Sequence, residues 1–146
     1  MSPVLSRTED KIVVLVDDEI AYIDLLQQLL SEHLACPVRG FTSPVEALKA
    51  LPGLNVGLII TDYQMPLMNG LEFIAEVQQK YPAIPAVMIT AYLLKFTKSE
   101  LAKVPALKAV VRKPFKWKML AEHVVKYWPD LQPPAVIGSG APFAQN

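Results

Sequence analysis

Five polar side chains stand at the ends of four apolar runs in the sequence, and their types suit phosphoryl chemistry. They are Asp17 and Asp18 after the first run, then Asp62, Thr90 and Lys113. Clustered carboxylates raise one another's pKa, and a hard divalent cation with oxygen ligands relieves their repulsion. If the four ends meet, they form a Mg²⁺ site beside an ammonium and a hydroxyl, prepared to take a dianionic phosphoryl group onto a carboxylate.

Each of these residues also has a simpler explanation when it is considered alone. Asp17 and Asp18 could stabilise the start of a following helix, and Asp62 could form an Asx turn. Lys113 could lie in an ordinary loop, and Thr90 could be a hydroxyl at a strand end. All of these explanations together require coincidences at four separate strand ends, so the combination favours a functional site.

The apolar runs alternate with segments in which apolar residues recur at helical spacing. Uninterrupted β-branched runs are typical of strands that are buried on both faces. We predict strands at 12–17, 37–41, 56–62, 85–91 and 107–111, and helices at 20–34, 44–52, 71–81, 97–104 and 116–128. This order predicts an α/β fold, a (βα)5 doubly wound parallel sheet with helices on both faces. Ligand sites in such sheets lie beyond the carboxyl ends of the strands, where the five side chains stand.

Length and composition limit the classes of function. The chain has 146 residues, of which 52% are hydrophobic, and its formal net charge is zero. These values suit one folded domain and do not indicate nucleic-acid or membrane binding. The apolar runs fall short of the roughly 20 residues of a membrane span, and no signal sequence is evident, so we expect a cytoplasmic protein. The single Cys36 excludes an intramolecular disulfide and a multi-cysteine metal site.

Four sequence segments together resemble a known family. They are VLVDDE at 14–19, TDYQMPLMNG at 61–70, ITA at 89–91 and RKPF at 112–115. In this order and spacing the chain resembles a response-regulator receiver domain of two-component signalling, over roughly residues 11–128. The resemblance implies the flavodoxin-like sheet with strand order 2-1-3-4-5, and a phosphorylation-dependent switch rather than a turnover enzyme.

The resemblance implies a role for each acid. Asp62 matches the phosphoacceptor, which receives its phosphoryl group from a histidine kinase or a phosphotransfer protein. Asp18, Asp62 and the backbone carbonyl of Gln64 match the ligands of Mg²⁺ (or Mn²⁺), and Asp17 acts mainly through a bound water. The reaction is therefore expected to depend on a divalent ion.

Further roles follow from the resemblance on the last two strands. Lys113 matches the residue that bonds the phosphoryl group, and Pro114 matches the proline after a cis peptide bond. Thr90 matches the hydroxyl that moves toward the phosphoryl group, and Ala91 matches the small residue that leaves room for it. The family's switch aromatic is missing, because Val110 stands at its position.

Two nearby aromatic residues are candidates for a substitute, Tyr92 and Phe96. Tyr92 stands two residues after Thr90, where a bulky side chain would shield the phosphoryl group from attacking water. We expect this shielding to lengthen the lifetime of the phosphorylated state.

The output is expected to be a changed partner-binding face. Phosphorylation adds about −1.5 to −2 charges, which shifts the populations of two conformations of the surface. The aromatic residues Trp117, Tyr127 and Trp128 could anchor a partner or a homodimer, although core packing is the simpler explanation. We expect residues 1–10 to be an extension and the Pro-rich segment 129–146 to be a flexible tail or the start of a linker.

Two alternatives to the switch stay open. A pseudo-receiver would act only as a protein-interaction module, and the absence of the switch aromatic at Val110 is compatible with that function. A Mg²⁺-dependent hydrolase with Asp62 as nucleophile resembles the haloacid-dehalogenase pattern Asp-x-Asp, but Gln64 stands where the second Asp would be.

Overall fold

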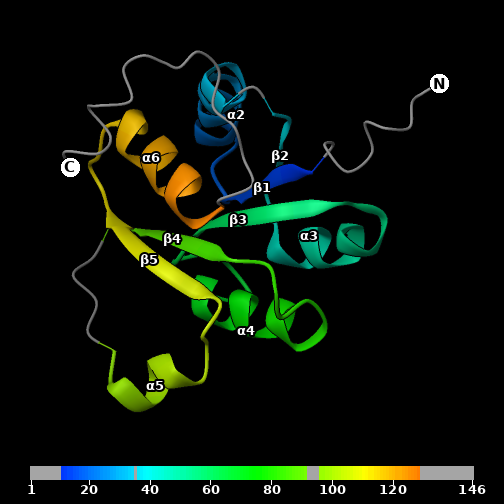
Figure 1. The fold of residues 1–146 in the computed structure, drawn as a ribbon, viewed down its shortest axis with the longest axis vertical. Helices are drawn as coiled ribbons and strands as arrows, with labels where there is room; N and C mark the ends of the chain where they lie inside the picture. Colours follow the sequence, from blue (N-terminus) through cyan, green and yellow to red (C-terminus); the bar gives the residue numbers. More distant parts are fainter. Residues whose placement is uncertain (1–10, 35, 92–95, 129–146) are drawn as a thin grey trace.

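The computed structural model describes residues 11–34, 36–91 and 96–128 and contains one parallel sheet (Figure 1). Its strands are β1 (Ile12–Val16), β2 (Val38–Phe41), β3 (Val56–Asp62), β4 (Ala86–Thr90) and β5 (Leu107–Arg112). They are arranged in the order β2-β1-β3-β4-β5, and every pair is parallel. The predicted strand order is therefore confirmed.

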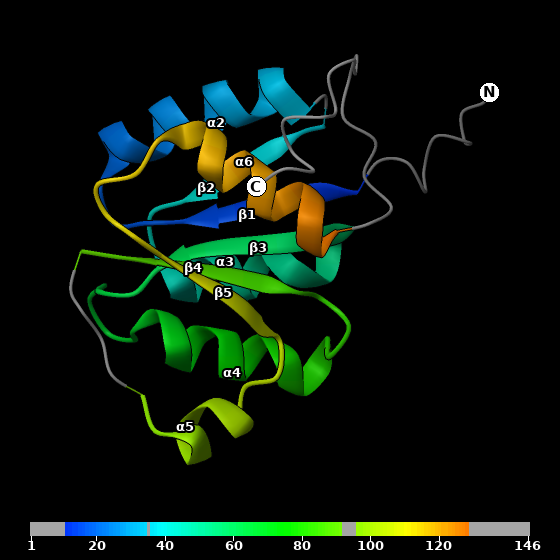
Figure 2. The same cartoon turned by 60° about the vertical axis from the view of Figure 1, so that its left-hand side comes forward.

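Helices cover both faces of the sheet. They are α2 (Ile20–Leu34), α3 (Pro44–Ala50), the short 3-10 helix η1 (Leu51–Gly53), α4 (Gly70–Lys80), α5 (Lys98–Ala102) and α6 (Trp117–Tyr127). In Figure 2 α2 and α6 lie on one side of the sheet, and α3, α4 and α5 lie on the other. This arrangement is the doubly wound architecture that the sequence predicts.

Each face of the sheet has its own hydrophobic core, as β1 illustrates. Val13 and Leu15 join the cluster under α2 and α6, whereas Val14 and Val16 join the cluster under α3 and α4. All four side chains are at most 1% exposed. A strand that is buried on both faces needs apolar residues at successive positions, which explains the uninterrupted apolar runs.

The predicted helix at 44–52 divides into two elements. Ser43 caps its start, because its hydroxyl accepts hydrogen bonds from the N–H groups of Val45 and Glu46. The α-helix ends at Ala50 and a 3-10 turn follows with Pro52 in its first turn. Proline has no N–H to donate to the carbonyl four residues earlier, so the α-helical bonding stops there.

The aromatic residues near the last helix contribute mainly to the core. Trp128 is 6% exposed and packs over Gly57, where any Cβ atom would overlap the indole ring. Trp117 and Tyr127 are partly buried against the α2–α6 core. Packing is therefore the main role of these rings in the structure.

Some predictions fall on other parts of the chain. The extension at 1–10, the tail at 129–146 and Tyr92 lie outside the described residues. None of the helices in the described part of the chain combines the length and the apolar character that a membrane crossing requires.

Candidate functional site

The register of the sheet brings Asp17 and Asp62 side by side at its carboxyl edge. Val16, the last residue of β1, pairs with Thr61 of β3, and Asp17 and Asp62 are the residues that follow this pair along the chain. The N–H of Asp17 extends the pairing toward β2 by donating to the Phe41 carbonyl at 3.1 Å. This backbone bond and the pairing of the preceding Val16 with β3 therefore hold Asp17 at this edge.

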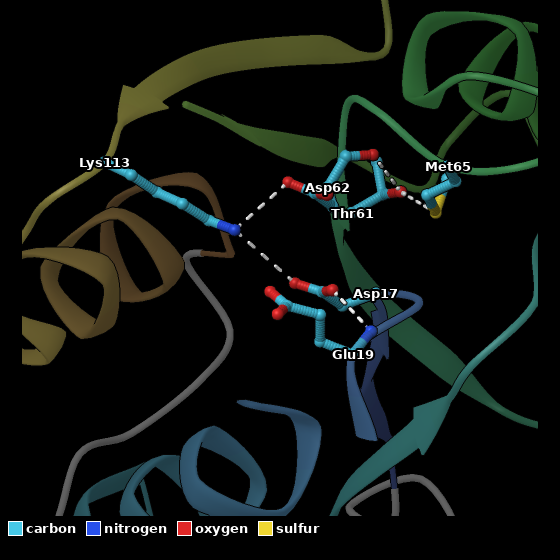
Figure 3. Close-up of polar contacts among 6 residues, drawn as sticks. All are labelled: Asp17, Glu19, Thr61, Asp62, Met65 and Lys113. Carbon is cyan, nitrogen blue, oxygen red and sulfur yellow. Dashed lines mark hydrogen bonds and ion pairs between the residues drawn. The ribbon is translucent and has the colours of Figure 1, made fainter. Parts of the chain in front are cut away.

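Thr90 and Lys113 are brought together by the pairing of β4 with β5. Thr90 pairs with Arg112, and the N–H of Lys113 donates to the Thr90 carbonyl at 2.7 Å. The peptide bond between Lys113 and Pro114 is cis. From this anchored backbone the Lys113 side chain extends toward the acids of β1 and β3 (Figure 3).

Three carboxylates form a compact set of oxygen donors. Ligand atoms of Asp17, Asp18 and Asp62 all lie within 4.8 Å of one another. Asp17 and Asp62 are 2% and 7% exposed, whereas Asp18 is exposed to solvent. A donor set of carboxylates, with no His or Cys in the cluster, fits a hard cation such as Mg²⁺, and the exposed side leaves room for water ligands.

Lys113 lies between the two buried acids. Its Nζ is 3.5 Å from Asp62 Oδ1 and 3.8 Å from Asp17 Oδ2 (Figure 3). These distances are longer than those of close charge-assisted hydrogen bonds. One ammonium thus stands beside two buried carboxylates, and the cluster keeps an excess of negative charge.

The electrostatics of the acids reflect this imbalance. Burial raises the pKa of Asp17 from 3.8 to about 6. The Glu19 N–H, which donates a hydrogen bond to Asp17 Oδ1 at 3.0 Å, partly opposes this rise. Burial also raises the pKa of Asp62, and the nearby Lys113 opposes that rise. Both carboxyls are therefore costly to ionise without additional positive charge, which a divalent cation would supply.

The chain leaves β3 through a tight turn. The N–H of Met68 donates to the carbonyl of Pro66 at 2.8 Å, and Leu67 between them has a φ of 75°. This combination is a γ-turn with a positive φ at its centre, a rare and strained conformation for a residue with a side chain. The Leu67 side chain is 88% exposed, so little packing offsets the strain.

A second close approach ends the same loop. The N–H of Gly70, the first residue of α4, donates to the Tyr63 carbonyl at 2.7 Å. A Cβ atom at Gly70 would overlap the carbonyl oxygen of Asp62. Asn69 and Glu72 form a reciprocal capping box at this helix start, with hydrogen bonds of 2.8 and 2.9 Å. The first turn of α4 is thus held against the backbone of Asp62.

Thr61 and Met65 support this loop from inside, and the sequence reasoning assigned them no function. The Thr61 hydroxyl is fully buried, donates to the Asp62 carbonyl at 2.9 Å and lies 3.9 Å from the Met65 sulfur. Met65 is 8% exposed. Met65, the first of the two methionines in the TDYQMPLMNG segment, therefore packs the loop into the core under α3 and α4.

Tyr22 is a second residue that the sequence reasoning missed. It lies in the first turn of α2, and the Nζ of Lys113 is 4.6 Å from the centre of its ring. Burial, followed by the charges of Asp17 and Asp62, raises the pKa of Tyr22 to about 12. The only sequence signal for it was an aromatic residue soon after the Asp17–Asp18 pair, which core packing explains equally well.

The predicted switch positions are spread over two strands. Thr90 ends β4 and is 2% exposed, and Ala91 directly after it is exposed. Val110 lies on the edge strand β5 and is 45% exposed. Gln64 is exposed in the loop after β3, two residues beyond Asp62. The roles of these residues stay predictions.

Phe96, one of the two candidate substitute aromatics, contacts the site through Tyr63. Its ring centre is 6.0 Å from that of Tyr63, in an edge-to-face arrangement at 61°. Tyr63 follows Asp62 directly and donates its N–H to the Ile89 carbonyl at 2.7 Å. An aromatic contact therefore exists next to Asp62, on a different element from the usual position on the last strand.

The chain belongs to a known family. The model of the response regulator receiver domain matches residues 13–125. The chain is therefore a member of the response regulator receiver domain family, whose general role is phosphorylation-dependent switching in two-component systems. Receiver domains are generally signalling modules rather than turnover enzymes, and they bind Mg²⁺ at an acidic pocket.

Curated relatives match the chain over little more than half its length. A protein-glutamate methylesterase/protein-glutamine glutaminase of Trichodesmium erythraeum is 32% identical over 80 residues, which is 54% of this chain and 23% of that protein. The hydrogenase transcriptional regulatory protein HoxA of Cupriavidus necator is 35% identical over 80 residues, or 55% of this chain and 16% of HoxA. The chain thus corresponds to less than a quarter of the length of these relatives.

Solved structures match nearly the whole described fold. The response regulator TrrA of Thermotoga maritima, in complex with Mg²⁺–BeF, is 32% identical, with a TM-score of 0.69 over 80% of this chain and 98% of that one. A protein from Neptuniibacter caesariensis is 33% identical, with a TM-score of 0.70 over 82% of this chain and 87% of its own. The chemotaxis protein CheY4 of Vibrio cholerae is 24% identical with a TM-score of 0.69, and this likeness concerns the fold.

Proposed function

We propose that this chain is a phosphorylation-dependent switch in which Asp62 accepts a phosphoryl group from a histidine kinase or a phosphotransfer protein. The observation that supports this most directly is the position of the Asp62 carboxylate, which shares one edge of the sheet with Asp17, Asp18 and Lys113. The proposed receiver unit spans residues 11–128.

In the proposed reaction, a carboxylate oxygen of Asp62 attacks the phosphorus of a phosphorylated histidine. The bond from phosphorus to the donor nitrogen breaks, and its electron pair stays on the departing imidazole. The Lys113 ammonium, 3.5 Å from Asp62 Oδ1, is placed to bond an oxygen of the incoming group. Attack by water on the same phosphorus would later break its bond to the Asp62 oxygen, release inorganic phosphate and return Asp62 to its free carboxylate.

The proposed metal ligands are the side chains of Asp18 and Asp62 and the Gln64 carbonyl, with Asp17 acting through a water. A bound Mg²⁺ or Mn²⁺ would supply positive charge to the oxygens of the phosphoryl group. The raised pKa values of Asp17 and Asp62 support this part of the proposal, because the buried acids favour a site that brings further positive charge.

The proposed readout begins at Thr90. Its carbonyl accepts the N–H of Lys113, so the two residues that would respond to the phosphoryl group are joined through the backbone. Movement of the Thr90 hydroxyl would then alter the exposed face around β5 and α5, which a partner reads. The Phe96–Tyr63 contact is the proposed replacement for the missing aromatic at Val110.

A direct experiment tests phosphorylation. The full chain is incubated with acetyl phosphate and Mg²⁺, and its intact mass is measured. We expect an increase of about 80 Da, which corresponds to one phosphoryl group, and its loss when EDTA is added first. The increase should also vanish in Asp62→Asn but persist in the control Asp24→Asn, which changes an exposed acid of α2.

A second candidate function is a pseudo-receiver that only binds partners. The exposed Val110 at the usual place of the switch aromatic favours it. This candidate predicts a folded protein that takes up no phosphoryl group from acetyl phosphate or from a phosphorylated kinase. An adduct on wild type that depends on Asp62 would exclude it.

A further inference from the structure

The proposed phosphoryl transfer makes no use of the contact between Tyr22 and Lys113. Lys113 Nζ lies 4.6 Å from the centre of the Tyr22 ring, within the range in which a cation is attracted to an aromatic face. The Lys113 side chain is only 23% exposed. Its ammonium is therefore bordered by two buried carboxylates and one aromatic ring.

The same ring also contacts the chain beyond the lysine. Tyr22 and Phe115 lie edge to face, with ring centres 6.4 Å apart at 77°. Phe115 follows the cis peptide bond between Lys113 and Pro114. Tyr22, from the start of α2, thus touches the connection between β5 and α6 both at the ammonium and two residues later.

The two kinds of attraction on the ammonium respond differently to a divalent ion. The attraction of Asp17 and Asp62 for Lys113 weakens when the same carboxylates face a bound cation, because their negative charge is then shared. A neutral aromatic ring keeps its attraction, because its quadrupole does not depend on the charge of the acids. A flexible lysine would otherwise gain freedom when the metal binds.

We propose that Tyr22 is a positioning residue that holds the Lys113 ammonium beside Asp62 when the acidic cluster carries its metal ion, so that Lys113 is in place when the phosphoryl group arrives. This inference rests on the proposed function of Asp62. In this proposal the face of the Tyr22 ring holds the ammonium, and the Tyr22 hydroxyl does not contribute. Tyr22→Phe should therefore preserve the effect, and a residue without a ring should lose it.

The test compares Tyr22→Phe, Tyr22→Leu and Tyr22→Met in the full chain. Phosphorylation by acetyl phosphate is followed at saturating Mg²⁺, and the NMR shift of the Lys113 Hε protons is measured with Mg²⁺ present. We expect the ring-free variants to accept phosphate about three- to tenfold more slowly, the equivalent of a lost cation–π contact. They should also lose an upfield ring-current shift on Lys113 that wild type and Tyr22→Phe share.

A matched control comes from the far end of the last helix. Tyr127 holds Lys126 over its ring at 5.3 Å, on a helix end away from the acids, so Tyr127→Leu removes a similar contact without touching the site. Its phosphorylation rate should equal that of wild type. The Mg²⁺ affinity of all Tyr22 variants, from NMR titration, should stay within about twofold of wild type, because Tyr22 supplies no ligand. A general loosening of the site would change affinity and rate together.

The outcomes separate the inference from the proposed function. Wild type that takes up no phosphoryl group contradicts the proposed function, and the inference falls with it. A second outcome would contradict the inference alone. In it, wild type is phosphorylated, and Tyr22→Leu and Tyr22→Met match its phosphorylation rate and its Lys113 NMR shift. Equal losses in Tyr22→Phe and Tyr22→Leu also overturn it, because they would assign the effect to the hydroxyl.

Discussion

Lys113 Nζ lies 3.5 Å from Asp62 Oδ1, although the two residues come from β3 and from the end of β5, with β4 between those strands in the sheet. The pairing of Lys113 N–H with the Thr90 carbonyl spans that gap. The long lysine side chain then crosses the edge to the acid. The proposed phosphoacceptor and its nearest cation are therefore positioned by strand order.

The charge of Lys113 should matter more than its packing. Lys113→Met keeps much of the side-chain volume but removes the ammonium, and we expect phosphorylation by acetyl phosphate to slow at least about tenfold. Lys116→Met is the control, because Lys116 is exposed three residues later. We expect Lys116→Met to be phosphorylated at the wild-type rate. A rate for Lys113→Met within twofold of wild type would show that the ammonium does not assist the transfer.

Asp17 should destabilise the metal-free protein at neutral pH. Its folded pKa of about 6 lies above its ordinary value of 3.8, so the folded state holds the proton more tightly than the unfolded state. Stability is therefore lost as the pH rises from about 4 to about 6, and the loss is complete at neutral pH. Asp17→Asn should raise the free energy of unfolding by about 2 kcal/mol at pH 7.5 in EDTA, measured by urea denaturation.

The pH dependence of that gain is its own control. Near pH 4 Asp17 is protonated in the folded state, so the advantage of Asp17→Asn should shrink toward zero. Asp24→Asn, which also removes one acid, should show no comparable gain at pH 7.5. An Asp17→Asn variant that is less stable than wild type at pH 7.5 would contradict the assigned cause, which is burial of the carboxyl.

Gly70 should not tolerate a side chain. A methyl group there would overlap the Asp62 carbonyl, which is backbone and moves only if the site loop moves. Gly70→Ala should lower the free energy of unfolding by about 2 kcal/mol in chemical denaturation. Gly53→Ala is the matched control, because a Cβ at Gly53 meets no atom within 4 Å. Equal stability of the two variants would argue against the close packing of α4 beneath Asp62.

Leu67 should store strain that glycine relieves. At a φ of 75° glycine has little conformational strain, whereas alanine keeps the steric conflict of leucine. Leu67→Gly should therefore be more stable than Leu67→Ala by about 1 kcal/mol, measured by thermal denaturation. At an ordinary position glycine is the less stable of the two, so the reverse order would contradict the positive φ.

The sequence predicted the elements well because a buried parallel sheet leaves a strong pattern. Strand β1 is apolar at every position since both of its faces are covered, and the acids that follow it lie at the open edge. The meeting of Asp17, Asp18 and Asp62 with Lys113 followed from one rule, that the carboxyl ends of parallel strands share an edge. The roles assigned to these residues remain predictions.

Features that depend on packing between distant elements were not predictable in the same way. The Tyr22 ring over Lys113 joins residues 91 positions apart (113 minus 22), and no local pattern marks it. The strained turn at Leu67 depends on the path from Asp62 to α4, and a leucine in the sequence does not indicate a positive φ. The burial of Trp128 against Gly57 likewise joins the residue after α6 to β3, far apart in the sequence.

Phosphorylation of Asp62 is tested most sharply by locating the phosphoryl group on the chain. Protein treated with acetyl phosphate and Mg²⁺ is reduced with borohydride, which converts an aspartyl phosphate to homoserine, and the modified residue is identified by tandem mass spectrometry of its peptides. We predict homoserine at position 62 and none in protein pretreated with EDTA. Homoserine at position 17 or 18 instead, or at no position in a folded protein, would contradict it.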